Sequence, residues 1–150
     1  MSVRIQEADF DLGKELAEFH GDPRIGAVVA FVGLVRDSND AARILEMTLE
    51  HYPGMTEKAL AAIVSEAGQR WSIIDALVIH RVGRLRPTDR IVAVAVAAEH
   101  RGAAFDAGEF IIDQLKTRAP FWKRELTTAG ARWVEARETD EQASERWQMG

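Results

Sequence analysis

The sequence predicts a mixed fold of helices and strands, of the α+β (mixed α/β) class. Short apolar segments with the character of β-strands alternate with amphipathic segments of helical period, and some strands follow one another directly. No repeat, linker or low-complexity stretch divides the chain. A chain of 150 residues is long enough to bury about two thirds of the surface that it exposes when unfolded. We therefore expect a single domain over residues 1–150.

Each element is predicted by its own pattern. Apolar residues recur every three or four positions in 60–71, which is the period of an amphipathic helix. Residues 25–35 are nearly all apolar, as in a strand buried on both faces, whereas 44–50 alternates as a half-exposed strand does. Asp9 or Asp11 can cap the first helix. The chain as a whole predicts strands at 3–6, 25–35, 44–50, 76–82, 91–98, 121–126 and 132–136, and helices at 12–19, 60–71, 102–118 and 139–147.

Composition excludes several classes of function. The net charge of -5 and the sequence pI near 5.4 argue against general binding to nucleic acid, which favours basic domains. The absence of cysteine excludes disulfides, thiolate metal sites and a cysteine nucleophile in this chain. The histidines lack metal-like spacing, so we expect no metal and no cofactor. The longest apolar runs are far shorter than the roughly 20 residues of a membrane-spanning helix, so we expect a soluble, cytoplasmic protein without membrane partners.

The segment 116–125 reverses the acidic character of the chain. Its first nine residues hold four cations, two aromatic side chains and no acid. Pro120 ends the preceding helix, so a turn there can bring Lys116 and Lys123 to one pocket. The pattern favours a local anion site, although cations at a helix C-terminus and a charged edge strand explain the same composition.

Further candidate cations follow two predicted strands. His100 and Arg101 come directly after the apolar strand 91–98, at a strand end where ligands often bind. Arg36 follows the other long apolar strand, three residues after Gly33, and its guanidinium can give two parallel hydrogen bonds to a phosphate. Taken alone, each of these residues is also explained as a surface charge or a helix cap.

Taken together, several segments resemble the large, catalytic subunit of molybdopterin synthase. The most specific is the string Lys-Thr-Arg-Ala-Pro-Phe-Trp-Lys-Arg-Glu at 116–125, for which chance agreement is negligible. The resemblance runs from about residue 26 to residue 147, in the segments 49–58, 80–83, 99–101, 115–125 and 132–136. Residues 1–25 match weakly, and we transfer no function to them.

The resemblance implies an α/β hammerhead fold and a homodimer of large subunits. It implies that a small ubiquitin-like sulfur-carrier subunit binds at each end, giving a heterotetramer. The carrier's C-terminal Gly-Gly thiocarboxylate would then donate sulfur to cyclic pyranopterin monophosphate, and two transfers would form the dithiolene of molybdopterin in molybdenum cofactor biosynthesis. Leu34 departs from the pattern, because some relatives have a lysine there. The family's pocket residues correspond to Arg36, His100, Arg101, Lys116, Lys123, Arg124 and Glu125.

The implied chemistry suits these residue types. A cyclic phosphate and a thiocarboxylate at about 4 Å repel each other by roughly 4 kcal/mol at an effective dielectric near 20, so the arginines and His100 are suited to holding anions. A desolvated lysine near other cations loses its proton more readily than a free one. We therefore expect Lys116, with Lys123 as its partner, to transfer a proton or to stabilise an oxyanion.

Two other functions stay open. A non-catalytic adaptor could use the same cations to bind the C-terminal tail of a ubiquitin-like partner without turning over a pterin. A small enzyme acting on a phosphate ligand would need no carrier protein. Mixing the protein with a thiocarboxylated carrier and the cyclic pyranopterin distinguishes all three.

Overall fold

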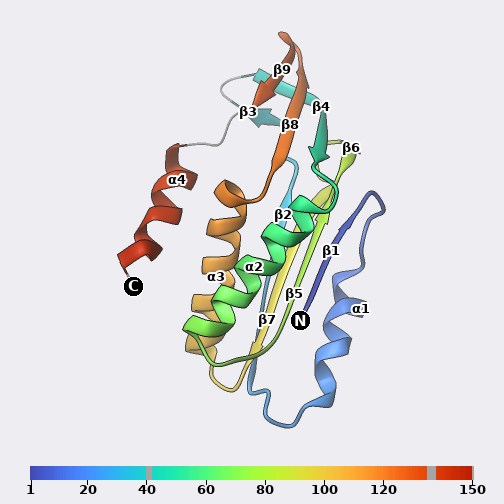
Figure 1. The fold of residues 1–150 in the computed structure, drawn as a ribbon. Helices are drawn as coiled ribbons and strands as arrows, with labels where there is room; N and C mark the ends of the chain where they lie inside the picture. The colour runs from blue at the N-terminus through green and yellow to red at the C-terminus, as the bar shows by residue number, and fades with distance from the viewer. Residues whose placement is uncertain (40–41, 135–137, 150) are drawn as a thin grey trace.

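The computed structural model describes residues 1–39, 42–134 and 138–149 (Figure 1). The strands are β1 (Ser2–Gln6), β2 (Ala27–Leu34), β3 (Ser38–Asn39), β4 (Ala42–His51), β5 (Ile73–Arg81), β6 (Gly83–Leu85), β7 (Arg90–Ala98), β8 (Phe121–Thr127) and β9 (Gly130–Val134). The helices are α1 (Leu12–Ala17), α2 (Met55–Arg70), α3 (Arg101–Arg118) and α4 (Glu138–Glu145), with short 3₁₀ helices at Glu18–Gly21 and Arg146–Met149. The predicted mixture of helices and strands is confirmed.

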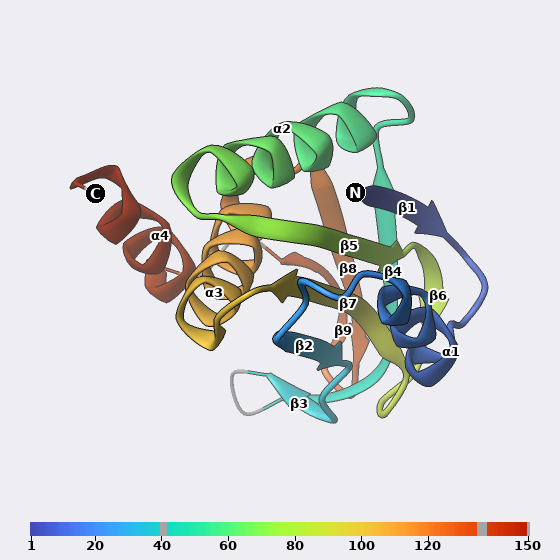
Figure 2. The same cartoon turned by 90° about the horizontal axis from the view of Figure 1, so that it is seen from below.

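The first sheet has the strand order β1-β5-β7-β2, with β1 parallel to β5 and the other pairs antiparallel. Helices α2 and α3 cover one face of this sheet and α1 lies on the other (Figures 1 and 2). Because side chains alternate along a strand, Val78 and Val94 face α2 and α3, whereas Ile79 and Ala95 pack toward α1. The central strand β7 is therefore buried on both faces.

The second sheet has the order β3-β4-β8-β9, and β6 pairs with β4. It lies at the end of the molecule where α3 finishes and β8 begins (Figure 1). Its inner face adds Met47, Leu49 and Leu85 to the apolar core that also lies beneath α2 and α3. The second sheet and the C-terminal end of α3 therefore share one boundary, and the candidate site lies there.

Two predictions about burial are corrected by the structure. Strand β2 is not buried on both faces in the single chain, because it pairs only with β7 at the edge of the sheet; Val28, Phe31 and Leu34 are 40%, 41% and 53% exposed. The alternation in 44–50 places Leu45 on the same face as Met47 and Leu49, but strand β4 has a register shift between Ile44 and Glu46, and Leu45 turns outward as a result.

Strand β6 lies between the two strands predicted at 76–82 and 91–98, where the sequence predicts no strand. The predicted strand end at residue 136 lies outside the described residues. The remaining predicted elements agree with the observed ones to within a few residues at their ends. Asp11 is the N-cap of α1, where its carboxylate accepts a hydrogen bond from the Lys14 amide at 3.2 Å.

Helix α4 packs along α3 (Figure 1). The indole Nε1 of Trp147 donates to Asp113 Oδ2 at 2.7 Å, and its ring makes edge-to-face contacts with Trp71 and Phe110. These contacts hold the C-terminal segment beside the last turns of α3. Within the described part of the chain, none of the helices has the length and apolar character that a membrane crossing needs.

Candidate active site

The turn at Pro120 brings Lys116 and Lys123 together, as the sequence predicts. Lys116 lies in the last turn of α3, and Lys123 lies on the inner face of β8. Thr56, at the start of α2, donates a hydrogen bond from Oγ1 to the Pro120 carbonyl at 3.0 Å, and this bond fixes the turn to α2. Both lysine side chains line the same two adjacent cavities.

The two cavities differ in size and polarity. The main cavity measures about 330 Å³ and has a polar wall formed by Arg36, Asn39, Glu125 and Asp140 besides the lysines. The inner recess measures about 70 Å³ and is lined by the two lysines with His80, Leu115, Ala119, Phe121 and Val134. The lysines therefore lie where a polar chamber meets a mostly apolar recess.

Lys116 is the titratable group of the site that the fold perturbs toward neutral pH. Burial lowers the pKa of its ammonium from 10.5 to about 8; the charge of Lys123 acts in the same direction, and Asp140 opposes both. With a pKa of about 8, on the order of a tenth of the lysine is neutral at pH 7. Lys116 can therefore give or take a proton near physiological pH.

Glu125 is buried at 4% exposure beside the lysines. Its carboxylate accepts hydrogen bonds from Asn39 Nδ2 at 3.2 Å and from Arg132 Nε at 3.2 Å. Arg132 Nη2 also donates to the Asn39 carbonyl at 2.8 Å. This network joins β3, β8 and β9, so the buried carboxylate fixes one wall of the main cavity.

Arg36 lies at the exposed mouth of the main cavity. Val35, the residue before Arg36, is fixed by two backbone hydrogen bonds. Its amide donates to the Asp89 carbonyl at 2.9 Å, and its carbonyl accepts from the Thr88 amide at 2.8 Å. Gly33 allows the Val92 side chain to approach the backbone closely, because a Cβ at residue 33 would lie 2.8 Å from Val92 Cγ1. The base of the loop that carries Arg36 is therefore rigidly placed.

The cationic side chains of the segment 116–125 do not all point toward the cavities. Arg118 leaves the cavity and pairs with Glu66 of α2 at 2.7 Å. Arg124 points to the outer face of β8, where it lies near Thr48, because successive residues of a strand face opposite sides. Only the two lysines of the cluster's cations line the main cavity and the recess, and the predicted substrate contact of Arg124 stays a prediction.

His100 and Arg101 lie far from the lysines of the same chain. His100 is the N-cap of α3 and Arg101 its first residue, and both side chains are exposed. Lys116 lies fifteen positions after Arg101 in α3, which corresponds to about 22 Å along the helix axis. The start of α3 is at the end of the molecule opposite the second sheet (Figure 1). One chain alone does not bring these residues into the pocket.

The cavities also contain residues that sequence reasoning did not single out as functional. His80 lines the inner recess, although its only sequence signal was its place in the resembling segment 80–83. Asp140 lines the main cavity from α4 and acts on the charge of Lys116. It was part of a polar tail without any pattern of its own. The resulting site is a cation-lined pocket with one readily titrated lysine, and these residue types suit an enzyme whose site binds an anion and moves a proton.

Comparisons with known proteins agree with this class. The family model described as MoaE protein matches residues 5–118. A molybdopterin synthase catalytic subunit of Ralstonia nicotianae is 66% identical over 97% of this chain and 84% of its own length. A second one, from Pseudomonas aeruginosa, is 56% identical over 99% of both chains.

Solved structures show the same fold. The molybdopterin biosynthesis MoaE protein of Burkholderia ambifaria has a TM-score of 0.84 and 55% identity, over 98% of this chain and 97% of its own. Molybdopterin synthase of Staphylococcus aureus has a TM-score of 0.80 and 32% identity, over 87% and 95%. A complex of subunits 1 and 2 of molybdopterin-converting factor from Helicobacter pylori, at 20% identity and a TM-score of 0.72 over 90% and 91%, shows the fold alone.

The chain therefore belongs to the MoaE protein family. The family match begins at residue 5, so it includes most of the N-terminal segment that the sequence resemblance left aside. It ends at Arg118, before Lys123, but the Pseudomonas aeruginosa relative aligns over 99% of the chain and so extends past the lysine pocket.

Proposed function

We propose that this chain is the catalytic subunit of molybdopterin synthase, a sulfur-transferring enzyme of molybdenum cofactor biosynthesis. Its donor is the C-terminal Gly-Gly thiocarboxylate of a small ubiquitin-like carrier, and its acceptor is cyclic pyranopterin monophosphate. The observation that carries the proposal is the pocket in which Lys116, with a pKa lowered to about 8, lies beside Lys123 in a chain of the MoaE family.

Each transfer moves one sulfur atom. A carbon–sulfur bond forms on the pterin as one of its carbon–oxygen bonds breaks, and the oxygen that leaves stays on the phosphate or departs as water. The carbon–sulfur bond of the carrier tail breaks as a water molecule adds its oxygen to the carbonyl carbon, which becomes a carboxylate. The tetrahedral intermediate at that carbon bears an oxyanion, which a fixed ammonium stabilises. Lys116 takes this role or the accompanying proton transfer, and Lys123 holds the second anion beside it.

Arg36 binds the phosphate of the pterin at the mouth of the main cavity, where its exposed guanidinium is free to form two parallel hydrogen bonds. Glu125 does not contact the substrate directly, because its carboxylate already accepts hydrogen bonds from Asn39 and Arg132. Its role is to keep this wall of the main cavity in place. Both roles depend on the position of the loop that begins after Val35.

A second copy of the chain completes the pocket. His100 and Arg101 are about 22 Å from Lys116 along α3, so a substrate held by Lys116 reaches them only if they come from another subunit. The exposed apolar side chains on the edge strand β2 favour a homodimer, because burying Val28, Phe31 and Leu34 removes apolar surface from water. A carrier on each subunit then gives a heterotetramer.

The carrier and the cellular location follow from the proposed reaction. The structure from Helicobacter pylori is a complex of two different subunits; for this chain, the carrier partner follows from the proposed reaction, which needs a sulfur donor. The cytoplasmic location expected from the sequence belongs to the same proposal.

Reconstitution of one turnover tests the function. The purified protein is mixed with cyclic pyranopterin monophosphate and with a carrier ending in a thiocarboxylate, and the dithiolene product is measured by mass. We expect product with this carrier and none with the same carrier ending in a carboxylate. Carrier binding without product would establish the adaptor instead, and pterin conversion without any carrier would establish a phosphate-ligand enzyme.

A further inference from the structure

His80 is a buried polar side chain next to the lysines. It lies on the face of β5 that turns toward α2 and α3, and it is 3% exposed. Its ring stacks on Phe121, with centroids 3.9 Å apart and an interplanar angle of 18°. Phe121 is the first residue of β8, two positions before Lys123. The imidazole is therefore fixed against the element that carries one of the two lysines.

The hydrogen bond of His80 determines which ring nitrogen bears the proton. Nδ1 lies 2.8 Å from the carbonyl oxygen of Arg81, and a carbonyl only accepts, so Nδ1 donates. Burial is the main cause that lowers the pKa of His80 to about 3, so the ring is neutral at pH 7. Nε2 is then an unprotonated acceptor.

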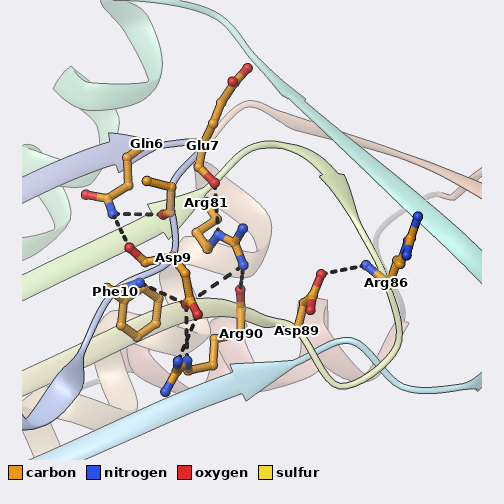
Figure 3. A network of polar contacts seen from close by, with 9 residues as sticks. Gln6, Glu7, Asp9, Phe10, Arg81, Arg86, Asp89 and Arg90 are labelled. Carbon is orange, nitrogen blue, oxygen red and sulfur yellow. Dashed lines mark hydrogen bonds and ion pairs between the residues drawn. The ribbon is translucent and has the colours of Figure 1, made fainter.

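The Arg81 carbonyl, which accepts the hydrogen bond from His80 Nδ1, belongs to a residue whose own side chain is held in place. The guanidinium of Arg81 donates from Nε to the Glu7 carbonyl at 3.0 Å and from Nη1 to the Arg90 carbonyl at 3.1 Å. Figure 3 shows Arg81 between these two groups, with Asp9 on one side. The backbone next to His80 therefore cannot turn easily, and the tautomer of the ring is fixed with it.

The inner recess offers few partners for an ammonium. Its other described lining residues, apart from the two lysines, are the apolar Leu115, Ala119, Phe121 and Val134. The imidazole is thus the side-chain acceptor among the described residues that line this recess. A volume of about 70 Å³ leaves room for about two water molecules.

We propose that His80 is a positioning residue for Lys116: its Nε2 accepts a hydrogen bond from the Lys116 ammonium, directly or through one water in the inner recess, and fixes the direction in which the ammonium points. This inference rests on the proposed function. The charged and titratable groups that face the pair are Lys123 of β8, His51 at the end of β4 and Asp140 of α4. Among them, the lysine and histidine offer no negative charge, and Asp140 lies on the main-cavity side.

Two substitutions separate the acceptor from the ring. His80→Phe keeps an aromatic ring on Phe121 but removes the acceptor, whereas His80→Gln keeps an amide oxygen near the position of Nε2. Since a hydrogen bond to the ammonium favours its charged form, losing the acceptor lowers the pKa of Lys116 further. We expect the pH midpoint of single-turnover sulfur transfer, about 8 in the unchanged protein from the pKa of Lys116, to fall by about half a pH unit in His80→Phe and to stay near its original value in His80→Gln.

A midpoint unchanged in His80→Phe, or shifted equally in both variants, would overturn the proposal, even if both variants lose activity through lower stability. The unchanged protein gives an independent readout without turnover. The ¹⁵N resonance of His80 Nε2 should be that of an unprotonated nitrogen and should respond to pH with a midpoint of about 8, together with the Lys116 ¹³Cε resonance. A protonated or unresponsive Nε2 contradicts the inference. Absence of sulfur transfer in the unchanged protein would instead contradict the proposed function, and the resonances would still decide about His80.

Discussion

The two ends of α3 treat their cations in opposite ways. At the C-terminal end, Lys116 is enclosed between β8 and α4, and its pKa is lowered. At the N-terminal end, His100 and Arg101 are exposed, and the N-cap side chain makes no capping hydrogen bond. The fold buries the cation at the C-terminal end of α3, and burial lowers the pKa of that ammonium. The cations at the N-terminal end stay exposed, where they can contact another molecule.

This difference separates two requirements of an anion site. Chemistry needs a group whose proton is easily moved, and only burial or neighbouring charge provides that. Binding needs charges that are fixed and hydrated until the ligand arrives, which exposed arginines provide. In the proposed homodimer, a single helix of α3's length therefore carries a reactive end for its own pocket and a binding end for the pocket of the other subunit.

The largest effect is expected from removing the reactive end. Lys116→Met should lower the single-turnover rate of sulfur transfer by about 1000-fold, since it removes both the proton donor and the oxyanion partner. Arg118→Met is the matched control, because Arg118 is two residues away but pairs with Glu66 outside the cavity, and it should change the rate less than about twofold. Equal losses in both variants would show that the helix end, and not the cavity lysine, determines the rate.

Mixed dimers test whether the binding end serves a neighbour. Lys116→Met and Arg101→Ala should each be poorly active alone. When the two variants are mixed and allowed to exchange subunits, half of the dimers contain both kinds of chain, and one of their two pockets is intact. The mixture should therefore regain about a quarter of the normal activity. No recovery, despite exchange shown by native mass spectrometry, would place Arg101 in the pocket of its own chain or in none.

The smallest expected effect concerns stability. The pKa of Lys116 is about 8 in the fold and 10.5 as its ordinary value, so below pH 8 the folded protein carries the cost of a buried ammonium. Lys116→Met should raise the free energy of unfolding at pH 7 by about 2 kcal/mol.

Between pH 8 and 10.5 the unfolded chain keeps the proton that the folded chain has lost, so the unchanged protein gains stability and the advantage of the methionine variant shrinks. Urea unfolding at a series of pH values measures this. Lys58→Met, an exposed change on α2, serves as the control and should stay within about 0.5 kcal/mol. An advantage that is the same at every pH would mean that burial of the ammonium is not its cause.

Local periodicity predicted most of the elements, because the periods of helix and strand are properties of the chain itself. The opposite orientation of Lys123 and Arg124 also follows from the sequence, because neighbouring residues of an extended segment face opposite sides of the strand. The exposure of Phe31 was not predictable from its apolar strand, because the pattern does not say how many strands lie beside it.

The site was predicted less completely than the fold. The two lysines were found through their unusual charge and the turn at Pro120, which are visible in the sequence. His80 and Asp140 were not, because their importance comes from tertiary packing: one is a polar residue on a buried strand, and the other reaches the cavity from a helix anchored by Trp147. The distance between His100 and Lys116 likewise follows only from the length and direction of α3.

The alternation along β8 limits how this protein can change. Lys123 and Glu125 face the cavity while Trp122 and Arg124 face outward, so inserting one residue between Phe121 and Trp122 would exchange the two sets. A tryptophan and an arginine would then meet the buried positions of the main cavity, and the carboxylate that holds Arg132 would point to solvent. Evolution can therefore lengthen the β8–β9 turn, but we expect it to conserve the exact spacing from Pro120 to Glu125.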